Sequence, residues 1–357
     1  MNGATSDVVT IGRVTQTVGD LLASLKRVVP FDKAAGWDPV GLQLGDPGAP
    51  VAKVAVCHEL TEGVVAALES DPVDLAVAYH PLLFGDVATF VAGRRPEGRA
   101  FRLVRAGVAV AVVHTAFDVA PGGAADALAA SLSLEEVTGF GPLWPADSCA
   151  VTVIVPVPAA SAVEAAMTDA GATPAAPFGI APVAAAGGGD EPTVNVEMLV
   201  EAPAVDRVVT AMAAAHPDAD PAYRVVDVKP SASFVGRCGS LGAPATLGDL
   251  AAVVADRIGG AIRVAGDPTD VVTTIAVVPG SGSSLISQVP PGVDVLVTGD
   301  VIHHRARAAL DRGLRIIDPG HVETERPGIA ALYAAICEMH DDVVDLTGIE
   351  VTPWRQA

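Results

Sequence analysis

Aromatic residues and lysines are scarce in this chain of 357 residues. Phe, Trp and Tyr make up 4% of it although half of its residues are hydrophobic, and it contains four lysines. An apolar fraction built mostly from Ala and Val suits closely packed α/β layers better than an aromatic-rich β-sandwich. The formal net charge of −20 excludes a general nucleic-acid binder, because phosphate neutralisation needs clustered Lys and Arg.

Long apolar runs and paired cysteines are also missing. The mean hydropathy is +0.45, yet Gly, Pro or charged residues interrupt every apolar run well before the length of a membrane span. Residues 1–16 lack a basic segment followed by an apolar one, so no secretory leader is predicted. Cys57, Cys149, Cys238 and Cys337 have no paired spacing, which predicts buried thiols in a reducing compartment. We therefore expect a cytoplasmic protein that does not enter a membrane.

Short apolar runs alternate with helical patterns, which predicts an α/β fold with parallel strands and crossover helices. The first series contains helices at 14–30, 61–69 and 97–106 and strands at 54–56, 73–80 and 107–114. The second contains strands at 262–265, 274–278, 294–298 and 314–318, a helix at 327–340 and one more strand in the tail. The simplest architecture is one domain, residues 1–145 and 233–357, split by an insertion.

The segment between the two series, residues 146–232, predicts a separate module. A composition change in GPLWPADSCA marks the boundary at about residue 146. Two strand-helix-strand patterns then occur in about 80 residues, a size that suits a ferredoxin-like α+β unit. The loop AAAGGGDEP, residues 184–192, is expected to be mobile.

Histidines follow three of the predicted strands. They are His80, His114 and His321, and the last two are followed four residues later by Asp118 and Glu325. A helix would place each of these carboxylates on the same face as its histidine. Because ligands collect outside the carboxyl ends of parallel strands, the three histidines could converge on one crevice. Imidazole and carboxylate together predict zinc, manganese, iron or cobalt rather than calcium or magnesium.

Each of these features also has a simpler interpretation. A histidine at a strand end often only bonds to the backbone, and Asp318 could either orient a metal ligand or cap its strand. The turn PGSGSSLI, residues 279–286, could bind an anion or be only a tight turn. Cys57, beside His58 and Glu59, is predicted to be a core thiol.

Two further groups could act on a substrate. His303 and His304 follow VTGD at the start of a predicted helix, where His304 is the preferred proton donor. Arg94 and Arg95 begin an arginine-rich stretch that could hold phosphates by bidentate hydrogen bonds. The alternative for these arginines is an ordinary solvated surface.

Six motifs occur in a fixed order: WDPVGLQLG, YHPLLF, HTAFDVAPGGAADALA, PGSGSSLI, VTGD followed by HH, and DPGHVETE. As an ordered set they resemble the family of GTP cyclohydrolase 1 type 2 homologues, also called Ngg-one-interacting-factor-three-like proteins. The likeness covers the first 145 residues and those from about 233 to 345. The middle segment is similar to the PII/CutA-like insertion of longer bacterial members. The resemblance implies two related α/β halves around a dinuclear metal site, often assembled as a homohexameric ring.

Carried over by position, the resemblance implies metal ligands at His80, Asp118, His321 and Glu325, with one carboxylate able to bridge two ions. The ions would be of the zinc, manganese or iron type, one or two per chain.

This sequence departs from the family pattern at two positions. Members usually have two adjacent histidines where this chain has Tyr79 followed by a histidine, and Ala116 stands where they have asparagine. A neutral phenol is a much poorer ligand than imidazole at neutral pH. A second ion would therefore bind weakly, use another ligand such as His114 or His58, or be absent.

The implied activity is a metal-dependent hydrolase that opens the guanine ring of GTP with metal-activated water. His304 or His114 would move protons, and Arg94 or Arg95 would bind the phosphates of this anionic small molecule. Phosphoester hydrolysis at the same site would be a different enzyme activity. The alternative outside catalysis is a metal-binding scaffold or regulatory protein whose insertion binds an effector, and Tyr79 and the Ala-rich insertion favour it.

Overall fold

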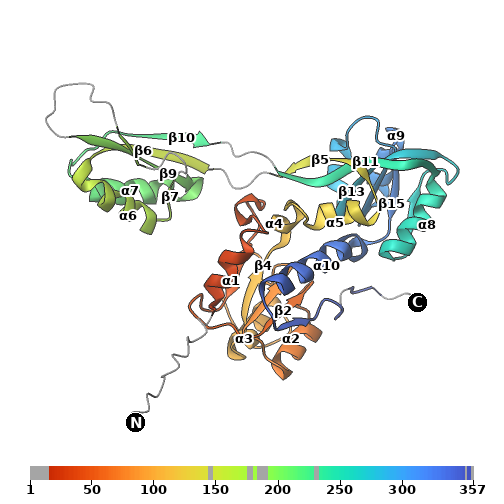
Figure 1. The fold of residues 1–357 in the computed structure, drawn as a ribbon, viewed down its shortest axis with the longest axis horizontal. Helices are drawn as coiled ribbons and strands as arrows, with labels where there is room; N and C mark the ends of the chain where they lie inside the picture. Colours follow the sequence, from red (N-terminus) through yellow and green to blue (C-terminus); the bar gives the residue numbers. More distant parts are fainter. Residues whose placement is uncertain are drawn as a thin grey trace, which may run out of the picture. The chain divides into compact units, whose positions relative to one another are not determined.

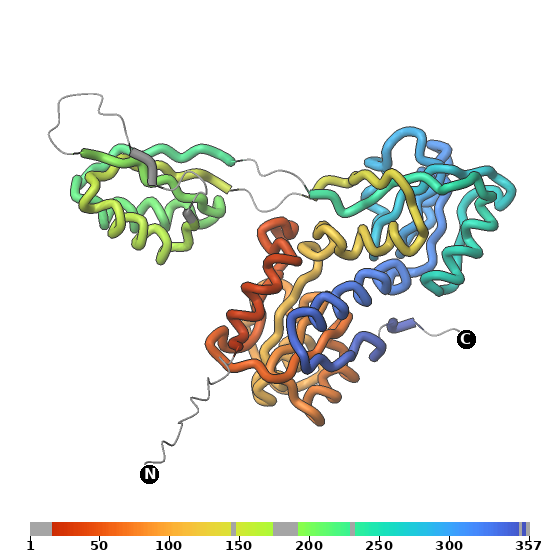
Figure 2. The backbone as a smooth tube through the Cα atoms, in the orientation of Figure 1, coloured from red at the N-terminus to blue at the C-terminus, as the bar shows by residue number. Residues whose placement is uncertain are grey.

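The computed structural model describes residues 16–143, 148–174, 180–182, 192–228, 233–349 and 352–354. They form two compact units. Figures 1 and 2 colour the chain from red at the N-terminus to blue at the C-terminus. We call the larger one, with residues up to 34, 38–143 and from 234 onward, the split domain, and the other, 35–37 and 144–233, the insertion. The predicted boundary near residue 146 and the predicted loop up to residue 191 lie outside the described residues. In the ranges described, no helix is long and apolar enough to span a bilayer.

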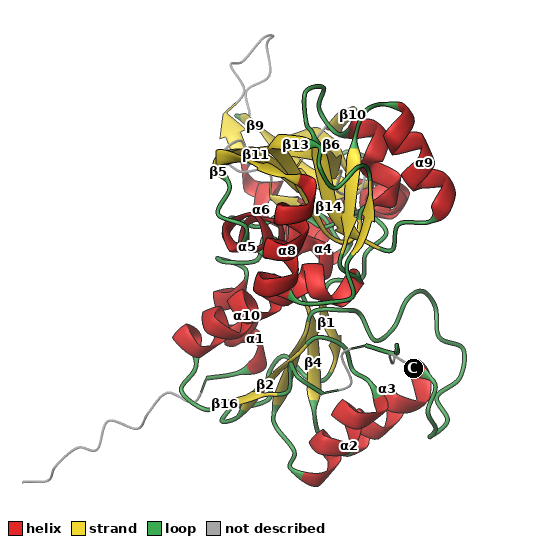
Figure 3. Ribbon diagram, turned by 90° about the vertical axis from the view of Figure 1, so that its right-hand side faces the viewer, coloured by secondary structure: helices red, strands yellow, loops and turns green. Residues whose placement is uncertain are grey.

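The first half of the split domain contains a five-stranded sheet in the order β1-β4-β3-β2-β16. Strands β4, β3, β2 and β16 are parallel, whereas β1 pairs antiparallel with β4. Strands such as AVAV in β4 are buried along their whole length, because helices cover both faces of the sheet (Figure 3). The elements are α1 Val18–Leu25, β1 Gly41–Leu44, β2 Val54–Cys57, α2 Glu62–Ser70, β3 Leu75–Ala78, α3 Pro96–Arg105, β4 Ala109–Val112, α4 His114–Asp118, α5 Ala124–Ser131 and β16 Val343–Asp345.

The second half contains a six-stranded sheet in the order β12-β15-β14-β13-β11-β5. Strands β13, β14 and β15 are parallel, while β12 and β11 pair antiparallel with β15 and β13. A 3-10 helix, Ser283–Gln288, follows β13. The elements are β5 Glu135–Leu143, β11 Ser233–Thr246, α8 Leu247–Ile258, β12 Arg263–Ala265, β13 Val271–Ser281, β14 Val295–Gly299, α9 His303–Asp311, β15 Arg315–Asp318 and α10 His321–Met339.

The two halves begin with the same local structure. Helix α1 follows Thr17 in TVGDL, and α8 follows Thr246 in TLGDL. In both, the threonine hydroxyl accepts a hydrogen bond from the backbone N–H of the aspartate three residues later, which caps the helix. The glycine between them donates its N–H to the carbonyl of Pro47 or Pro268. The halves are therefore structural repeats, and the shared TxGDL motif is their signature in the sequence.

A carboxylate ties neighbouring strands together in the same way in each half. Asp74, before β3, accepts the backbone N–H groups of residues 52–53 at 2.7 and 2.9 Å. Asp294, before β14, accepts those of residues 273–274 at 2.7 and 2.9 Å. Each carboxylate fixes the spacing of two central strands, so the strands of both halves end at defined positions.

The halves exchange their last helices. Helix α5 belongs to the first half, but its Leu128 is buried in the core of the second sheet. Helix α10 belongs to the second half, but its Leu332 is buried against the first sheet beside α1. Where the two helices meet, a Cβ on Gly328 would lie 2.6 Å from the Cβ of Ala124, so the glycine permits their close approach. Burial of such side chains, about 2 kcal/mol each, stabilises the contact between the halves.

The insertion is an antiparallel sheet in the order β10-β6-β9-β7, with β8 also on β9. Helices α6 and α7 pack on it through a shared apolar core. This order is that of a β-α-β-β-α-β ferredoxin-like unit, and the closer likeness to PII or CutA stays a prediction. The elements are β6 Ser148–Pro156, α6 Ala160–Asp169, β7 Thr173–Pro174, β8 Ile180–Pro182, β9 Thr193–Glu201, α7 Val205–Ala215 and β10 Tyr223–Val228.

The structure corrects two sequence predictions. The last helix is predicted at 327–340, but α10 begins at His321 and contains Pro327 in its second turn. The predicted start is wrong because proline is most common in the first turn of a helix, and the prediction therefore places Pro327 there. Cys337 is exposed on α10, whereas the other three cysteines are buried as predicted. Burial raises the pKa of the Cys57 thiol to about 12, which agrees with a core thiol.

Candidate metal centre

The carboxyl ends of β2, β3 and β4 place aromatic and imidazole side chains side by side. His58 follows β2, Tyr79 and His80 follow β3, and His114 comes shortly after β4. Backbone hydrogen bonds continue beyond the strands, from the His80 N–H to the His58 carbonyl and from the His114 N–H to the Tyr79 carbonyl, both 2.9 Å. The parallel ladder therefore fixes which rings are neighbours before any side chain interacts.

Glu325, in the second turn of α10, brings a carboxylate to these rings. Its Oε2 lies 2.7 Å from His58 Nε2 and 3.2 Å from His80 Nε2, and its Oε1 lies 3.0 Å from His321 Nε2. The side chains of Glu325 and His58 are each only 4% exposed. The predicted pairing of His321 and Glu325 on one helix face is present.

The electrostatics keep this carboxylate ionised. Burial alone would raise the pKa of Glu325, but hydrogen bonds with His321, His58 and His80 hold it well below its usual range. The same contact with Glu325, together with Asp300, raises the pKa of His321 to about 9 despite partial burial. The cluster therefore contains a fixed negative charge with three imidazoles around it.

Residues of the second half orient His321 and limit the space beside Glu325. Asp300, directly after β14, lies with its Oδ2 2.7 Å from His321 Nδ1, so Nε2 points toward Glu325. A carboxylate on the outer nitrogen is the usual support of a metal-binding histidine. Gly280, in β13, has φ of +63°, and a Cβ there would lie 2.6 Å from Glu325 Oε1. Asp300 and Gly280 lie in the motifs VTGD and PGSGSSLI, but the sequence does not predict their contacts with His321 and Glu325.

Asp118 has a different partner from the one predicted. The hydroxyl of Tyr79, a side chain that is 1% exposed, donates a hydrogen bond to Asp118 Oδ1. Burial raises the pKa of Asp118 to about 7, although the Tyr79 hydrogen bond opposes the shift. Burial and the neighbouring carboxylates, Asp118 first, also raise the pKa of Tyr79, so it remains a neutral donor.

His114 is held by Asp38. Its Nδ1 lies 3.0 Å from Asp38 Oδ2, which also accepts the backbone N–H of Thr115 at 3.0 Å. Burial would lower the pKa of His114, but Asp38 outweighs it and raises the pKa. The ring centroid lies 5.1 Å from that of His80, so His114 is next to the cluster around Glu325.

The donor set fits a divalent ion of the zinc type. One donor atom from each of His58, His80 and Glu325 lies within 4.8 Å of the others. Donor atoms around a tetrahedral zinc ion are about 3.3 Å apart, close to the 2.7 and 3.2 Å separations from Glu325 Oε2. The Nδ1 of His58 is buried and has no hydrogen-bond partner among the described residues, which leaves its Nε2 as the functional nitrogen.

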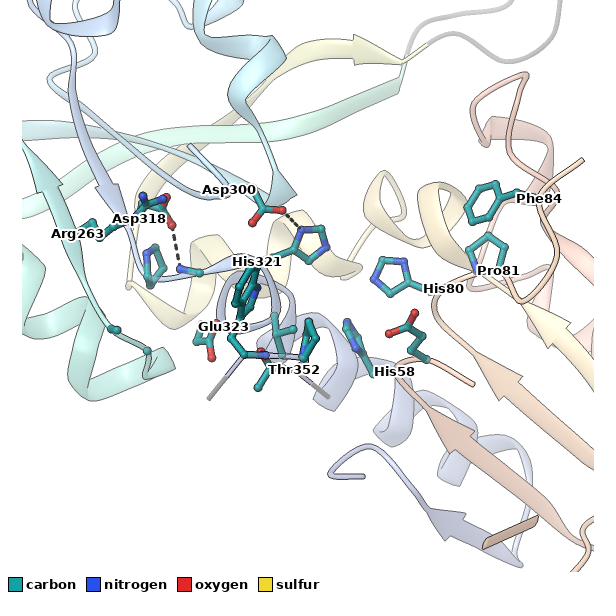
Figure 4. Close-up of a pocket in the computed structure, with 18 residues that line it drawn as sticks. His58, His80, Pro81, Phe84, Arg263, Asp300, Asp318, His321, Glu323 and Thr352 are labelled. Carbon is teal, nitrogen blue, oxygen red and sulfur yellow. Dashed lines mark hydrogen bonds and ion pairs between the residues drawn. The ribbon is translucent and has the colours of Figure 1, made fainter. Parts of the chain in front are cut away.

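A cavity of about 860 Å³ opens onto this cluster (Figure 4). His58 and His80 line it from the first half, and His321 and Asp300 line it from the second. Its charged lining is mostly acidic. It comprises Glu59, Asp300, Asp318 and Glu323 against Arg263, whose guanidinium is paired with Asp318. Arg263 is thus already paired, and His321, with its raised pKa, adds a second cationic side chain to the described lining.

Other predicted site residues lie outside the lining of this cavity. His304 is exposed at the start of α9 with its ring beside His303, and Arg94 and Arg95 are exposed before α3. Farther along α3, Arg102 pairs with two glutamates of α2 and so has a structural role. Asp318 lines the cavity but accepts the backbone N–H of residue 301 at 3.0 Å, as a strand-end cap would.

The glycine-rich segment at the end of β13 is a tight turn held by threonines. The N–H of Gly280 donates to Thr324 Oγ1 and that of Gly282 to Thr298 Oγ1, both at 2.8 Å. These two backbone donors are therefore used within the protein, which agrees with the simpler of the two sequence interpretations.

The fold and the site define a class: a repeated two-sheet α/β protein with an imidazole and carboxylate cluster where its halves meet. The chain belongs to the Duf34/NIF3 (NGG1p interacting factor 3) family, whose sequence model matches residues 16–353. This match spans both halves of the split domain and the insertion.

Curated relatives and a solved structure agree with this assignment. The chain is 29% identical to a Bacillus subtilis protein named GTP cyclohydrolase 1 type 2 homolog, covering 86% of this chain and 89% of that one. It is 32% identical to a Mycobacterium tuberculosis protein of the same name, covering 87% and 88%. The crystal structure of a Bacillus cereus protein related to NIF3 matches with a TM-score of 0.66 and 27% identity, covering 96% and 100%.

Proposed function

We propose that this protein is a divalent-metal-dependent hydrolase that opens a nitrogen heterocycle, with the guanine ring as the first candidate. The observation that carries the proposal is the buried Glu325 carboxylate with three imidazole nitrogens directed at its two oxygens beside an open cavity. The name of the relatives, GTP cyclohydrolase 1 type 2 homolog, supplies the guanine nucleotide.

Each residue of the cluster has a defined part. His58, His80 and Glu325 would hold the ion, and His321, oriented by Asp300, would complete the set from the cavity side. When bound, such an ion lowers the pKa of water and polarises the atom under attack. Two of these histidines come from the first half and the carboxylate comes from the second, so the site requires both halves.

Proton transfer would fall to His114. Asp38 holds its Nδ1 and thereby fixes the ring beside His80. Its raised pKa keeps it protonated closer to neutral pH, as a proton donor to a leaving ring nitrogen requires. His304 is exposed at the start of α9, whereas the His114 ring lies beside that of His80, so His304 has no part in this proposal.

The charged side chains of the cavity lining suggest a comparison of guanosine with GTP as substrates. Arg94 and Arg95 do not line it, and Arg263 is already paired with Asp318. We therefore expect guanosine to be opened at least as well as GTP by the zinc-loaded or manganese-loaded protein. Loss of purine absorbance measures ring opening, and release of inorganic phosphate would instead indicate phosphoester hydrolysis.

The second candidate is a non-catalytic metal-binding scaffold whose insertion binds an effector. The Tyr79–Asp118 hydrogen bond favours it, because this contact occupies one oxygen of a carboxylate that could otherwise bind an ion. Stoichiometric metal binding without turnover of guanosine, GTP or other nucleotides would support the scaffold and contradict the hydrolase.

A further inference from the structure

The internal repeat gives the split domain two equivalent carboxylates, and they have different surroundings. Asp118 and Glu325 each stand four residues after a histidine that begins the helix following the third parallel strand, β4 or β15. Glu325 faces imidazole nitrogens at 2.7, 3.0 and 3.2 Å. Asp118 faces the hydroxyl of Tyr79. Glu325 is thus surrounded by potential metal ligands, whereas the equivalent Asp118 faces a phenol.

Tyr79 is buried beside Asp118 and packs against the neighbouring imidazoles. Its side chain is 1% exposed, and its ring centroid lies 4.9 Å from that of His80 and 5.8 Å from that of His114. The hydroxyl presents its proton to Asp118 Oδ1, so this oxygen is already bonded. A buried aromatic side chain with such neighbours cannot move aside without leaving a cavity.

His58 compensates for the imidazole that Tyr79 does not provide. Its ring stacks on that of Tyr79, with centroids 5.8 Å apart and planes 12° apart, and its Nε2 lies 2.7 Å from Glu325 Oε2. The ring is buried at the end of β2, and its Nδ1 bonds to nothing among the described residues. The buried Nε2 is therefore the nitrogen of His58 that faces Glu325, beside the Nε2 of His80, which lies 3.2 Å from the same carboxylate oxygen.

We propose that each chain binds one divalent ion at Glu325, between His58 and His80, and that Tyr79 closes the equivalent position at Asp118. The inference rests on the metal site of the proposed function and is independent of hydrolysis. Zinc or another ion of similar ligand preference fits, because the donors are imidazole and carboxylate.

The test is the number of ions per chain. The full-length protein is stripped with a chelator, reloaded with excess zinc, desalted, and measured by elemental analysis against amino-acid analysis. We expect one zinc ion in the native chain and one in the isosteric Tyr79→Phe variant, which loses the hydroxyl but gains no ligand. We expect two in Tyr79→His, which supplies an imidazole to Asp118. Two ions in the native chain, none in it, or one in Tyr79→His would overturn the proposal.

Two more variants test the ligand assignment. Asp118→Asn should retain the ion, whereas His58→Ala should weaken zinc binding at least about tenfold, with His58→Asn as a polar replacement should the alanine variant fail to fold. Titration with cobalt gives an independent readout, because its visible absorbance should saturate at one equivalent in the native chain. Loss of the ion in Asp118→Asn, or unchanged affinity in both His58 variants, contradicts the assignment. One ion without turnover would remove the hydrolase and leave this inference intact.

Discussion

The two halves of the split domain share a scaffold but differ in the side chains at the carboxyl ends of their strands. Both begin with a TxGDL helix cap, and both tie their central strands with a carboxylate, Asp74 or Asp294. At those strand ends, the first half has His58, Tyr79 and His80, whereas the second has glycine and Asp300. The repeat thus fixes positions, and the side chains at those positions decide which half supplies nitrogen ligands and which supplies their orientation.

The exchange of helices brings the ligands of the two halves into one cluster. Because α10 packs against the first sheet, Glu325 of the second half reaches histidines of the first. Neither half has the complete cluster, so metal binding and the contact between the halves should depend on each other.

Substitution of the two equivalent carboxylates gives the largest expected difference. Glu325→Gln removes the charge that three imidazoles face, and we expect zinc affinity to fall by more than about 100-fold. Asp118→Asn should change it less than about threefold, because Tyr79 already bonds this side chain. Titration calorimetry of both variants at neutral pH measures the effect. Similar losses in the two variants would refute the difference between the halves.

The glycine of the second half gives the next effect. Gly280→Ala would place a Cβ 2.6 Å from Glu325 Oε1 at φ of +63°, so we expect zinc affinity to fall about tenfold. Gly292→Ala is the matched control, because it has φ of +89° but no described atom within 4 Å of the added Cβ. It should lower stability by about 1 kcal/mol and leave zinc affinity unchanged. Equal zinc affinity in the two variants would show that the carboxylate tolerates the new methyl group.

The strand-linking carboxylates should have similar effects in both halves. Asp74→Ala and Asp294→Ala each leave two backbone donors without their acceptor, and we expect a loss of about 1 to 3 kcal/mol in unfolding free energy. Urea unfolding of the chelated protein measures both. A large effect in one half alone would contradict the structural repeat.

The stabilising contribution of Asp294 should depend on pH. Hydrogen bonds from residues 273–274 outweigh burial and lower its pKa. Its stabilising contribution is therefore present above the unfolded-state pKa and is lost as the pH falls through the folded-state value. The cost of Asp294→Ala should be larger at neutral pH than in acid, and an equal cost at both would disprove the assignment.

The helix caps give the smallest expected effect. Thr17→Ala and Thr246→Ala should each cost about 1 kcal/mol, because each removes the side-chain acceptor of a first-turn N–H. The two caps lie in different halves, so the double variant should show the sum of the single losses. Thermal unfolding of the single and double variants provides the values.

The sequence predicts the strands well and the partners of their terminal residues less well. Short apolar runs between helical patterns locate β2, β3, β4, β13, β14 and β15. The His-x-x-x-carboxylate spacing predicts the His321–Glu325 contact. The same spacing suggests an equal role for Asp118. The structure places the Tyr79 hydroxyl against Asp118, a contact that is set by a neighbouring strand and that the spacing does not predict.

The remaining parts of the site depend on tertiary contacts. The sequence names His58 only as one alternative ligand, and its contact with Glu325 appears once β2 and α10 are placed together. Asp300 and Asp38 hold histidines that are distant in sequence, through contacts that no local pattern encodes. The repeated TxGDL is visible in the sequence and identifies the two halves, but it does not indicate that they exchange helices.

A crystal structure of the zinc-loaded protein, with anomalous data at the zinc edge, tests the central claim most directly. The account predicts one anomalous peak per chain, about 2.0 to 2.2 Å from His58 Nε2, His80 Nε2 and a Glu325 oxygen, with Tyr79 still bonded to Asp118. A peak on Asp118, or two peaks in one chain, would contradict it.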